Sequence, residues 1–397
     1  MPPDHGAEIR QSARFLYLYA LAAGGGAVAY VPFLTILLPL RVQVLGDARA
    51  LDVLAIIAFC GAIAASLGNV AFGWLSDRSG RRTPWIVGGM LASSALLIAV
   101  PLAQSPSMLI ALIVAWQLAL NMMLGPLSAW AGDCVPDSQK GMLGGLLAFA
   151  PAIGALSGSV VTVKGFAAAD VRLLWVAGAV VAMVSPVLLF GRPRAMPHLV
   201  TPRTVEGSEH GKAGWAVRRM WLARLLVQVS EASLFAFLLM WLRSLDPGIH
   251  ENRAAGIFTA VLSAAVLIAL AVGRWSDRTE RPIEPLAVAA GVAAAGLTIM
   301  AMAPGMTAAL IGYVVFGLAS SVFLALHTGQ TLRVLPQPQH RGRDMGVFNL
   351  TNTVPSLIMP WLTLALVPRY GFESLFAVLT VLSASAAVML ALMARRS

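Results

Sequence analysis

Three side chains that could bind a proton or a polar ligand share one face of a predicted helix. Arg224, Gln228 and Glu231 stand at positions i, i+4 and i+7 of an apolar stretch, a spacing that puts them on the same helical face. A charge in the middle of a membrane costs at least about 2.5–3.5 kcal/mol, so this face should line a cavity or meet a partner. Glu231 lies roughly 10 Å further along the helix than Arg224, so we expect no direct ion pair between them. A carboxyl group desolvated at that depth could bind and release a proton.

Polar side chains in three other apolar stretches are further candidates for binding a substrate or a coupling ion. Histidine is of special interest because it titrates near neutral pH. Interhelical hydrogen bonds in membranes contribute only about 0.6 kcal/mol each, so every one of these residues could instead be structural. The candidates are Gln117 and Asn121, His327 and Gln330, and Asn349 and Asn352.

A charged motif occurs twice, at a constant offset of 200 residues. The sequence GWLSDRSGRR begins at Gly73, and GRWSDRTER begins at Gly273. The copies are unequal, because the first contains Gly80 and Arg82 where the second contains Glu280 and Pro282. A repeat at this distance indicates two similar halves laid head to tail, the build of secondary transporters.

The acidic residues of this repeat have two possible kinds of partner. An aspartate at the end of one helix can face the unpaired N–H groups at the start of another, which attract a carboxylate. Asp133, at the end of a later apolar stretch, could pair with Arg81 or Arg82. The alternative is an exposed ion pair worth about 0–1 kcal/mol, in a loop that only sets topology.

The elements that position these residues are membrane spans. Of the 397 residues, 58% are hydrophobic and 12% charged, and the mean hydropathy is +0.79. One span needs about 20 apolar residues, so the uncharged run between Pro84 and Asp133 holds two. A single soluble core could not bury such runs. We predict twelve spans, at 14–40, 52–75, 84–103, 107–131, 142–163, 172–191, 216–242, 254–275, 283–303, 306–332, 344–366 and 371–394.

The basic residues orient these spans. Twenty of the 28 Lys and Arg residues fall on one side and seven on the other, with Arg224 inside a span. Positive charge marks the cytoplasmic side, so both termini and the central loop should be cytoplasmic. The excess of Arg over Lys suggests a GC-rich bacterial genome and hence the bacterial inner membrane. We expect a first bundle over 1–191, a cytoplasmic linker over 192–214 and a second bundle over 215–397.

The first charged motif resembles the helix 2–3 loop of the major facilitator superfamily, G-x-L-x-D-R-x-G-R-R, without a gap. The resemblance implies an all-α membrane protein with twelve transmembrane helices in two pseudo-symmetric six-helix bundles. It also implies that Asp77 meets helix 11, which starts near Asp344, in one transport state only. The degraded second copy predicts a weaker role for Asp277. The implied gating residues are Gly73, Asp77, Arg78, Gly80, Arg81, Arg82, Asp133, Asp277 and Arg278.

A finer resemblance links the chain to the sucrose and glycoside/pentoside/hexuronide cation symporters. It rests on Gly125-Pro126 with Asp133-Cys-Val-Pro136, and on Asp344-Met-Gly-Val-Phe-Asn349 with Val354-Pro-Ser-Leu-Ile-Met-Pro360. Arg333 stands near the position where that branch often has an acid. The implied function is secondary active transport by alternating access, as proton-coupled uptake of a sugar or glycoside. Proton-driven efflux of a drug or metabolite is the alternative, because exporters share the loop motif.

Other classes of function lack support in the sequence. No HExxH, GxSxG or P-loop motif occurs, so we expect no enzyme and no catalytic residues. A membrane sensor would need an output domain. The two cysteines, Cys60 and Cys134, suggest neither a disulfide nor a metal site. The expected partners are a small-molecule substrate, a coupling proton and the lipid bilayer, with no cofactor and no nucleic acid, and the protein should be a monomer.

Overall fold

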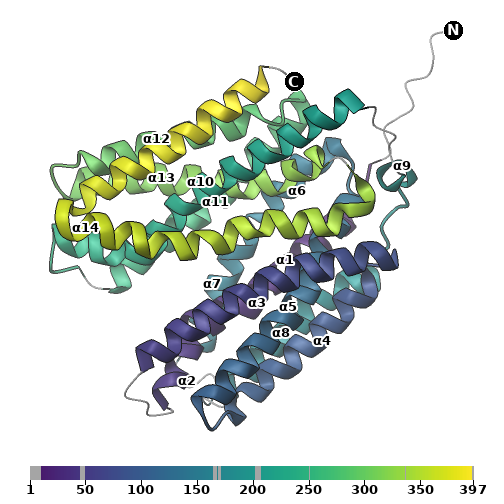
Figure 1. Ribbon diagram of the computed structural model, residues 1–397, viewed down its shortest axis with the longest axis horizontal. Helices are drawn as coiled ribbons and strands as arrows, with labels where there is room; N and C mark the ends of the chain where they lie inside the picture. The colour runs from purple at the N-terminus through teal and green to yellow at the C-terminus, as the bar shows by residue number, and fades with distance from the viewer. Residues whose placement is uncertain are drawn as a thin grey trace.

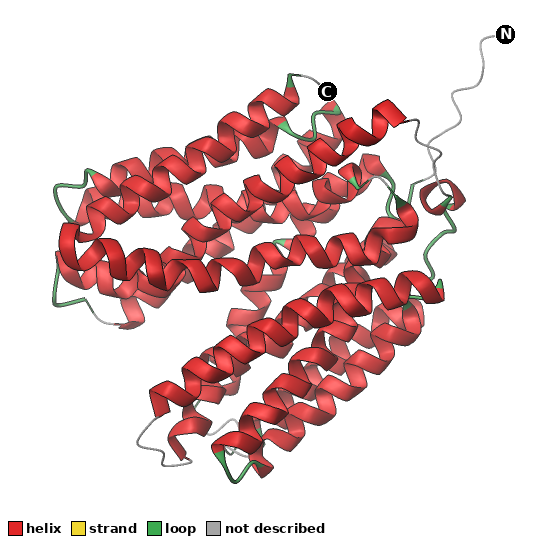
Figure 2. Ribbon diagram, viewed as in Figure 1, coloured by secondary structure: helices red, strands yellow, loops and turns green. Residues whose placement is uncertain are grey.

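The described part of the chain is helical throughout. The computed structural model describes residues 10–44, 50–163, 168, 171–201, 207–249, 251–335 and 337–395, which form helices, turns and loops but no strand (Figure 2). A helix satisfies its backbone hydrogen bonds within one segment, as a long apolar run inside a membrane requires. The prediction of an all-α membrane protein is therefore confirmed.

The first half of the chain forms α1 to α8. The side chain of Ser12 accepts a hydrogen bond from the Phe15 N–H and so caps α1. The first predicted span continues beyond Pro32 through a π-helical turn, Phe33–Leu37, into α2. The fifth span is divided between α6 and α7. The helices are α1 (Ala13–Pro32), α2 (Leu38–Val44), α3 (Ala50–Ser79), α4 (Thr83–Ala99), α5 (Pro106–Cys134), α6 (Lys140–Leu147), α7 (Phe149–Val161) and α8 (Arg172–Phe190).

The second half forms the remaining long helices. Two predicted spans are merged in α14, where Gly371 has a non-helical backbone with φ of 74°. Glycine adopts this left-handed conformation without steric cost, and it lets the chain reverse between the spans. The helices are α10 (Gly207–Leu245), α11 (Glu251–Thr279), α12 (Glu284–Ala301), α13 (Met306–Val334) and α14 (Arg341–Ala394).

The predicted linker is more structured than a loop. A short helix, α9 (Pro197–Val200), lies within it, and α10 begins at Gly207, eight residues before the predicted boundary at 215. The Leu199 carbonyl accepts a hydrogen bond from Arg341, which ties α9 to the start of α14. Residues 202–206 of the linker lie outside the described part of the chain.

All twelve predicted spans are helical in the structure. Among the described residues, ten helical segments are long and apolar enough to cross a membrane. The other two predicted spans, 216–242 and 344–366, lie within the long helices α10 and α14. The first of them contains Arg218, Arg219, Arg224 and Glu231, whose charges lower its hydropathy.

The helices form two bundles that meet along a few elements (Figure 1). In the first bundle α1 packs against α7 and α8, and α3 and α4 pack against α5. In the second, α14 packs against α10 and α12, and α13 packs against α11 and α12. The bundles touch where α3 meets α14 and where α6 meets α11 and α13. Side chains at these contacts can therefore respond to movement of one bundle against the other.

Candidate functional site

Glu231 lies in a small pocket within the second bundle. Residues of α10, α11 and α13 line it, mostly apolar ones such as Leu234, Phe258 and Val261, together with Tyr313 and Ser320. The Gln228 side chain donates a 2.7 Å hydrogen bond to Oε2 of Glu231. The carboxyl group thus has one neutral hydrogen-bond donor, in surroundings with few other polar groups.

Arg224 does not pair directly with Glu231, in agreement with their separation along α10. Its guanidinium donates to Oγ1 of Thr328 at 3.1 Å and, more weakly, to the Leu324 carbonyl and the Asn352 side chain, each at 3.4 Å. It still interacts electrostatically with Glu231. The shared helical face therefore carries two charges that influence each other without touching.

His327 is a buried neighbour of Arg224. Its Nε2 lies 3.0 Å from the Met220 carbonyl, which can only accept, so Nε2 must carry a proton. Nδ1 lies 3.5 Å from Arg224, from which it can only accept, and 3.0 Å from Oγ1 of Thr331, whose hydroxyl also donates to the His327 carbonyl at 2.9 Å. The ring is fully buried. These contacts occupy both ring nitrogens within the bundle and indicate that His327 is neutral and positions Arg224.

The remaining polar candidates fall into two groups. Asn121 accepts from the Asn69 side chain at 2.9 Å and donates to the Gln117 carbonyl, so it joins α3 to α5 deep in the first bundle. Asn352 is exposed and donates to Asn349 at 2.7 Å. Gln117 and Gln330 are buried. The structure thus brings Asn352 and His327 to Arg224 and leaves Gln117 and Asn121 in the other bundle.

A first ion-pair network, here the first clasp, joins the bundles at the ends of α3 and α5. Both carboxylate oxygens of Asp77 accept backbone N–H bonds at the start of α14, from Gly342 and Arg343, each at 2.9 Å. Arg82 binds Asp77 at 2.7 Å and Asp133 at 2.9 Å. Arg341 of α14 binds the other oxygen of Asp133 at 2.6 Å. The first clasp consists of Asp77, Arg82, Asp133 and Arg341 with these two amides.

The second copy of the motif forms the second clasp. Asp277 accepts from the backbone N–H groups of Gly141 at 2.8 Å and Met142 at 2.7 Å, at the start of α6. Arg333 pairs with the same carboxylate at 2.8 Å and also binds the Asp137 carbonyl. The weaker role predicted for Asp277 has no basis in this geometry, because Asp277 and Asp77 each hold two amides and one guanidinium.

Glycines allow both clasps to close. A Cβ atom at Gly73 would lie 2.2 Å from the Gly342 carbonyl oxygen, and one at Gly273 would lie 2.2 Å from that of Gly141. Any side chain at either position would hold the bundles apart. The repeated glycine therefore serves contact between bundles, whereas the left-handed turn that follows α3 uses Gly80, whose φ is 64°.

The other basic residues of the motif point away from the clasps. Arg78 and Arg278 are exposed, and the Arg78 guanidinium lies 5.8 Å from the centroid of the Trp74 ring. Arg81 is exposed as well.

Burial would lower the pKa of the Arg82 guanidinium, but the charges of Asp133 and Asp77 outweigh this effect and raise that pKa. Arg82 therefore stays charged between its two carboxylates.

Two arginine partners of these aspartates were not predicted from the sequence. Arg341 binds Asp133, and Arg333 binds Asp277. A signal for the second pair was present, because Arg333 stands 200 residues after Asp133 while Pro282 replaces Arg82 at the same offset. The second half therefore lacks an arginine at position 282, in the loop after α11, and has Arg333 at the end of α13 instead.

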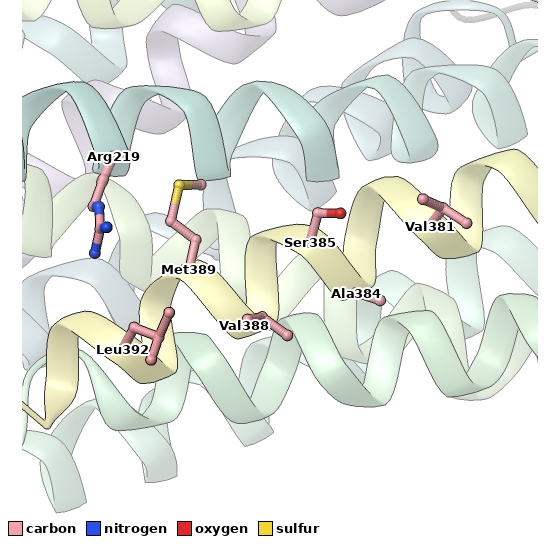
Figure 3. A pocket seen from close by; sticks show the side chains of 7 residues that line it. All are labelled: Arg219, Val381, Ala384, Ser385, Val388, Met389 and Leu392. Atoms are coloured by element: carbon pink, nitrogen blue, oxygen red, sulfur yellow. The ribbon is translucent and has the colours of Figure 1, made fainter.

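A larger groove lies elsewhere in the second bundle. Arg219 of α10 lines it with one stretch of α14, from Val381 to Leu392 (Figure 3). Val381 and Val388 are more than half exposed on the outside of the helix pair. None of the predicted polar candidates lines this groove, so Arg224 and Glu231 form the stronger candidate site.

Comparison with known proteins agrees with this architecture. Three solved transporters share the fold at low identity: the human organic anion transporter MFSD10 (TM-score 0.78, 12% identity, 95% of this chain and 99% of that one), the transporter FucP in the outward conformation (0.72, 14%, 96% and 98%), and a bacterial homologue of the iron transporter ferroportin in its outward-facing state (0.71, 16%, 95% and 97%). No curated protein sequence matches. The sequence profile of the Major Facilitator Superfamily matches residues 16–245 and 220–397, and the chain belongs to this superfamily of membrane transporters.

Proposed function

We propose that this protein is a proton-coupled symporter that takes up a small hydroxylated solute, such as a sugar or glycoside, by alternating access. The observation that carries the proposal is the position of Glu231 in the middle of α10, beside Gln228 and within electrostatic reach of Arg224. The other acidic residues of the described chain lie in loops or near helix ends and kinks. Glu231 is therefore the carboxyl group best placed to carry a proton across the bilayer.

The two clasps support an alternating-access cycle. They join the bundles at the end that the basic residues predict to be cytoplasmic, so we assign this structure to a state closed to the cytoplasm. Transport would require both clasps to open. In this proposal the protein lies in the bacterial inner membrane as a monomer, with residues 1–191 and 215–397 as the moving bundles and both termini in the cytoplasm.

The structural neighbours support transport but do not select the solute. They include a fucose:proton symporter of E. coli and the human organic anion transporter, both under 20% identical to this chain. The polar face of α10 and the exposed Asn352 favour a solute with several hydrogen-bonding groups. Hydroxyl groups could bind to the amides of Gln228 and Asn352.

Proteoliposomes test the coupling role of Glu231. Under an inward proton gradient the wild-type protein should concentrate the solute, whereas Glu231→Gln should only exchange it across the membrane. Glu373→Gln is the matched control, because Glu373 is an exposed acid of the same bundle. If Glu231→Gln still concentrates the solute as the wild type does, the proposal is wrong.

Proton-driven efflux is a second candidate function. The apolar walls of the Glu231 pocket, including Leu234, Val261 and Phe316, favour it because they suit a hydrophobic substrate. An antiporter requires its substrate and its proton to bind alternately, so substrate binding should release protons. A symporter binds both together, so binding should take protons up. Proton exchange measured on substrate addition in weak buffer therefore separates the two candidates.

A further inference from the structure

Arg224 differs from the arginines of the clasps in its partners. Arg82, Arg333 and Arg341 each contact at least one carboxylate at 2.6–2.9 Å. In the described part of the chain, no carboxylate lies within ion-pair distance of Arg224, although it is partly buried in α10. A guanidinium inside a membrane protein is costly unless an anion meets it. Glu231 compensates its charge only from a distance.

The hydrogen bonds of Arg224 leave its guanidinium able to bind a ligand. Its four hydrogen-bond acceptors are all neutral, and three of the four distances are 3.4–3.5 Å, longer than a strong hydrogen bond. One acceptor, Asn352, is exposed. The shortest contact, 3.1 Å to Oγ1 of Thr328, and the neighbouring His327 ring orient the guanidinium but leave it able to donate further hydrogen bonds. Its planar fork of N–H groups matches the two oxygens of a carboxylate.

We propose that Arg224 binds a carboxylate of the transported solute, which is therefore a small monoanion such as a sugar acid. This inference deepens the proposed symport function and depends on Glu231 as the proton carrier. Asn349, Asn352 and Gln228 would bind hydroxyl groups of the same solute, because each offers an amide near the polar face.

The pair of charges explains why anion and proton would move together. In the empty protein the positive Arg224 and the negative Glu231 sum to zero. A proton alone on Glu231 leaves one positive charge, and an anion alone at Arg224 leaves one negative charge. With both bound the sum is zero again. Because an uncompensated charge is costly in the membrane interior, the empty and the fully loaded protein change state most easily.

The same balance of charges makes the two ligands bind cooperatively. Protonation of Glu231 removes the charge that competes for Arg224, so the anion binds more tightly, and by linkage the anion favours protonation. Among the described residues, the other titratable groups in electrostatic reach of Glu231 are the phenols of Tyr30 on α1 and Tyr313 on α13. His327 is the titratable group beside Arg224. Even an ordinary phenol ionises only near pH 10, so both tyrosines are neutral at physiological pH, and the contacts of His327 indicate a neutral ring. Arg224 and Glu231 thus determine the net charge of the site.

Binding to the purified full-length protein tests the inference without any transport step. Glucuronate, gluconate, lactate and benzoate are each compared with the corresponding neutral amide by thermal shift. At least one acid should stabilise the wild type at a concentration where its amide does not. Arg224→Gln should weaken that binding at least tenfold, whereas Arg218→Gln, which removes an exposed charge six residues earlier on α10, should not. Equal stabilisation by acid and amide, or by no acid of the set, overturns the inference.

A second measurement uses only the wild type, in case Arg224→Gln does not fold. Symport of one proton with one monoanion is electroneutral, so a membrane potential should leave uptake unchanged. Symport of a proton with a neutral sugar moves charge and would be accelerated by an inside-negative potential. That acceleration overturns the role of Arg224 but leaves Glu231 as the coupling group. Concentrative uptake by Glu231→Gln would instead refute the proposed function, while acid binding at Arg224 could persist.

Discussion

The two clasps place an aspartate in the same position but neutralise it with different residues. In the first, Arg82 of the loop bridges Asp77 and Asp133. In the second, Pro282 occupies the position of that arginine, and Arg333 occupies the position of Asp133. Arg333 then pairs directly with Asp277. The pseudo-symmetry thus preserves the contact between carboxylate and helix start, while the ion pair around it has been rebuilt.

The clasps also differ in how far they depend on a single carboxylate. Arg82 keeps a second carboxylate partner when Asp77 is lost, whereas the described residues offer Arg333 no carboxylate other than Asp277. The side chains of Asp277 and Arg333 are 9% and 15% exposed, so water compensates little. The copy of the motif that is more degraded in sequence should therefore be the more sensitive to mutation.

The largest expected effect is a contrast between Asp277→Asn and Asp77→Asn. Loss of one partner from a buried ion pair costs about 3–5 kcal/mol, and Asp277→Asn should approach that value. Asp77→Asn should cost only about 1–3 kcal/mol, the range for a lost hydrogen-bond partner, because Arg82 retains Asp133. Each substitution lowers the stability of the closed state only. Spin labels at the exposed positions Arg78 and Gln339 measure the population of the closed state as a distance distribution. The labels are attached in a variant in which Cys60 and Cys134 are replaced by serine.

A double substitution checks the cause of this contrast. In Asp277→Asn, the additional change Arg333→Gln removes the unpaired charge and should recover part of the closed population. Arg82→Gln should not rescue Asp77→Asn, because it also leaves Asp133 with one partner fewer. The explanation fails if the two aspartates have equal effects or if Arg333→Gln makes the defect worse.

The second contrast concerns the glycines, where the two clasps should behave alike. Gly73→Ala and Gly273→Ala each place a methyl group 2.2 Å from a carbonyl oxygen of the opposite bundle. Overpacking of this kind costs roughly 1–3 kcal/mol, and only the closed state pays it. Transport should slow and the label distances lengthen in both variants. Gly178→Ala is the control, because a Cβ atom there meets nothing within 4 Å. A defect in Gly178→Ala of similar size would mean that helix propensity, rather than contact, is measured.

Much of the fold followed from the sequence because hydropathy and repeats are local signals. Every predicted span is helical, and the 200-residue offset located both clasps. The start of α10 at Gly207 was not predicted, since the helix continues over residues 207–215, a segment too polar to be counted as part of a span. Hydropathy locates the membrane boundary, whereas helix length depends on backbone hydrogen bonds and packing.

The site was less predictable, because its residues come together only through tertiary packing. The helical spacing of Arg224, Gln228 and Glu231 could be read along one helix, and so could the lack of a direct Arg224–Glu231 pair. The contact of His327 with Arg224 joins two helices about a hundred residues apart, and no sequence period indicates it. The contact of Arg341 with Asp133 is equally long in range.

The smallest expected effect lies in the turn that follows each motif. Gly80 and Glu280 occupy equivalent positions with φ of 64° and 55°, in the left-handed region that costs a non-glycine residue about 1–2 kcal/mol. Glu280→Gly should therefore stabilise the protein by about 1 kcal/mol, and Gly80→Ala should destabilise it by a similar amount. Thermal unfolding in detergent measures both. Because Glu280 is exposed and has no resolved role in the second clasp, its replacement should leave the Asp277 contacts unchanged. If the Glu280→Gly variant is less stable than the wild type, the glutamate side chain stabilises the fold by more than the left-handed backbone at this position destabilises it.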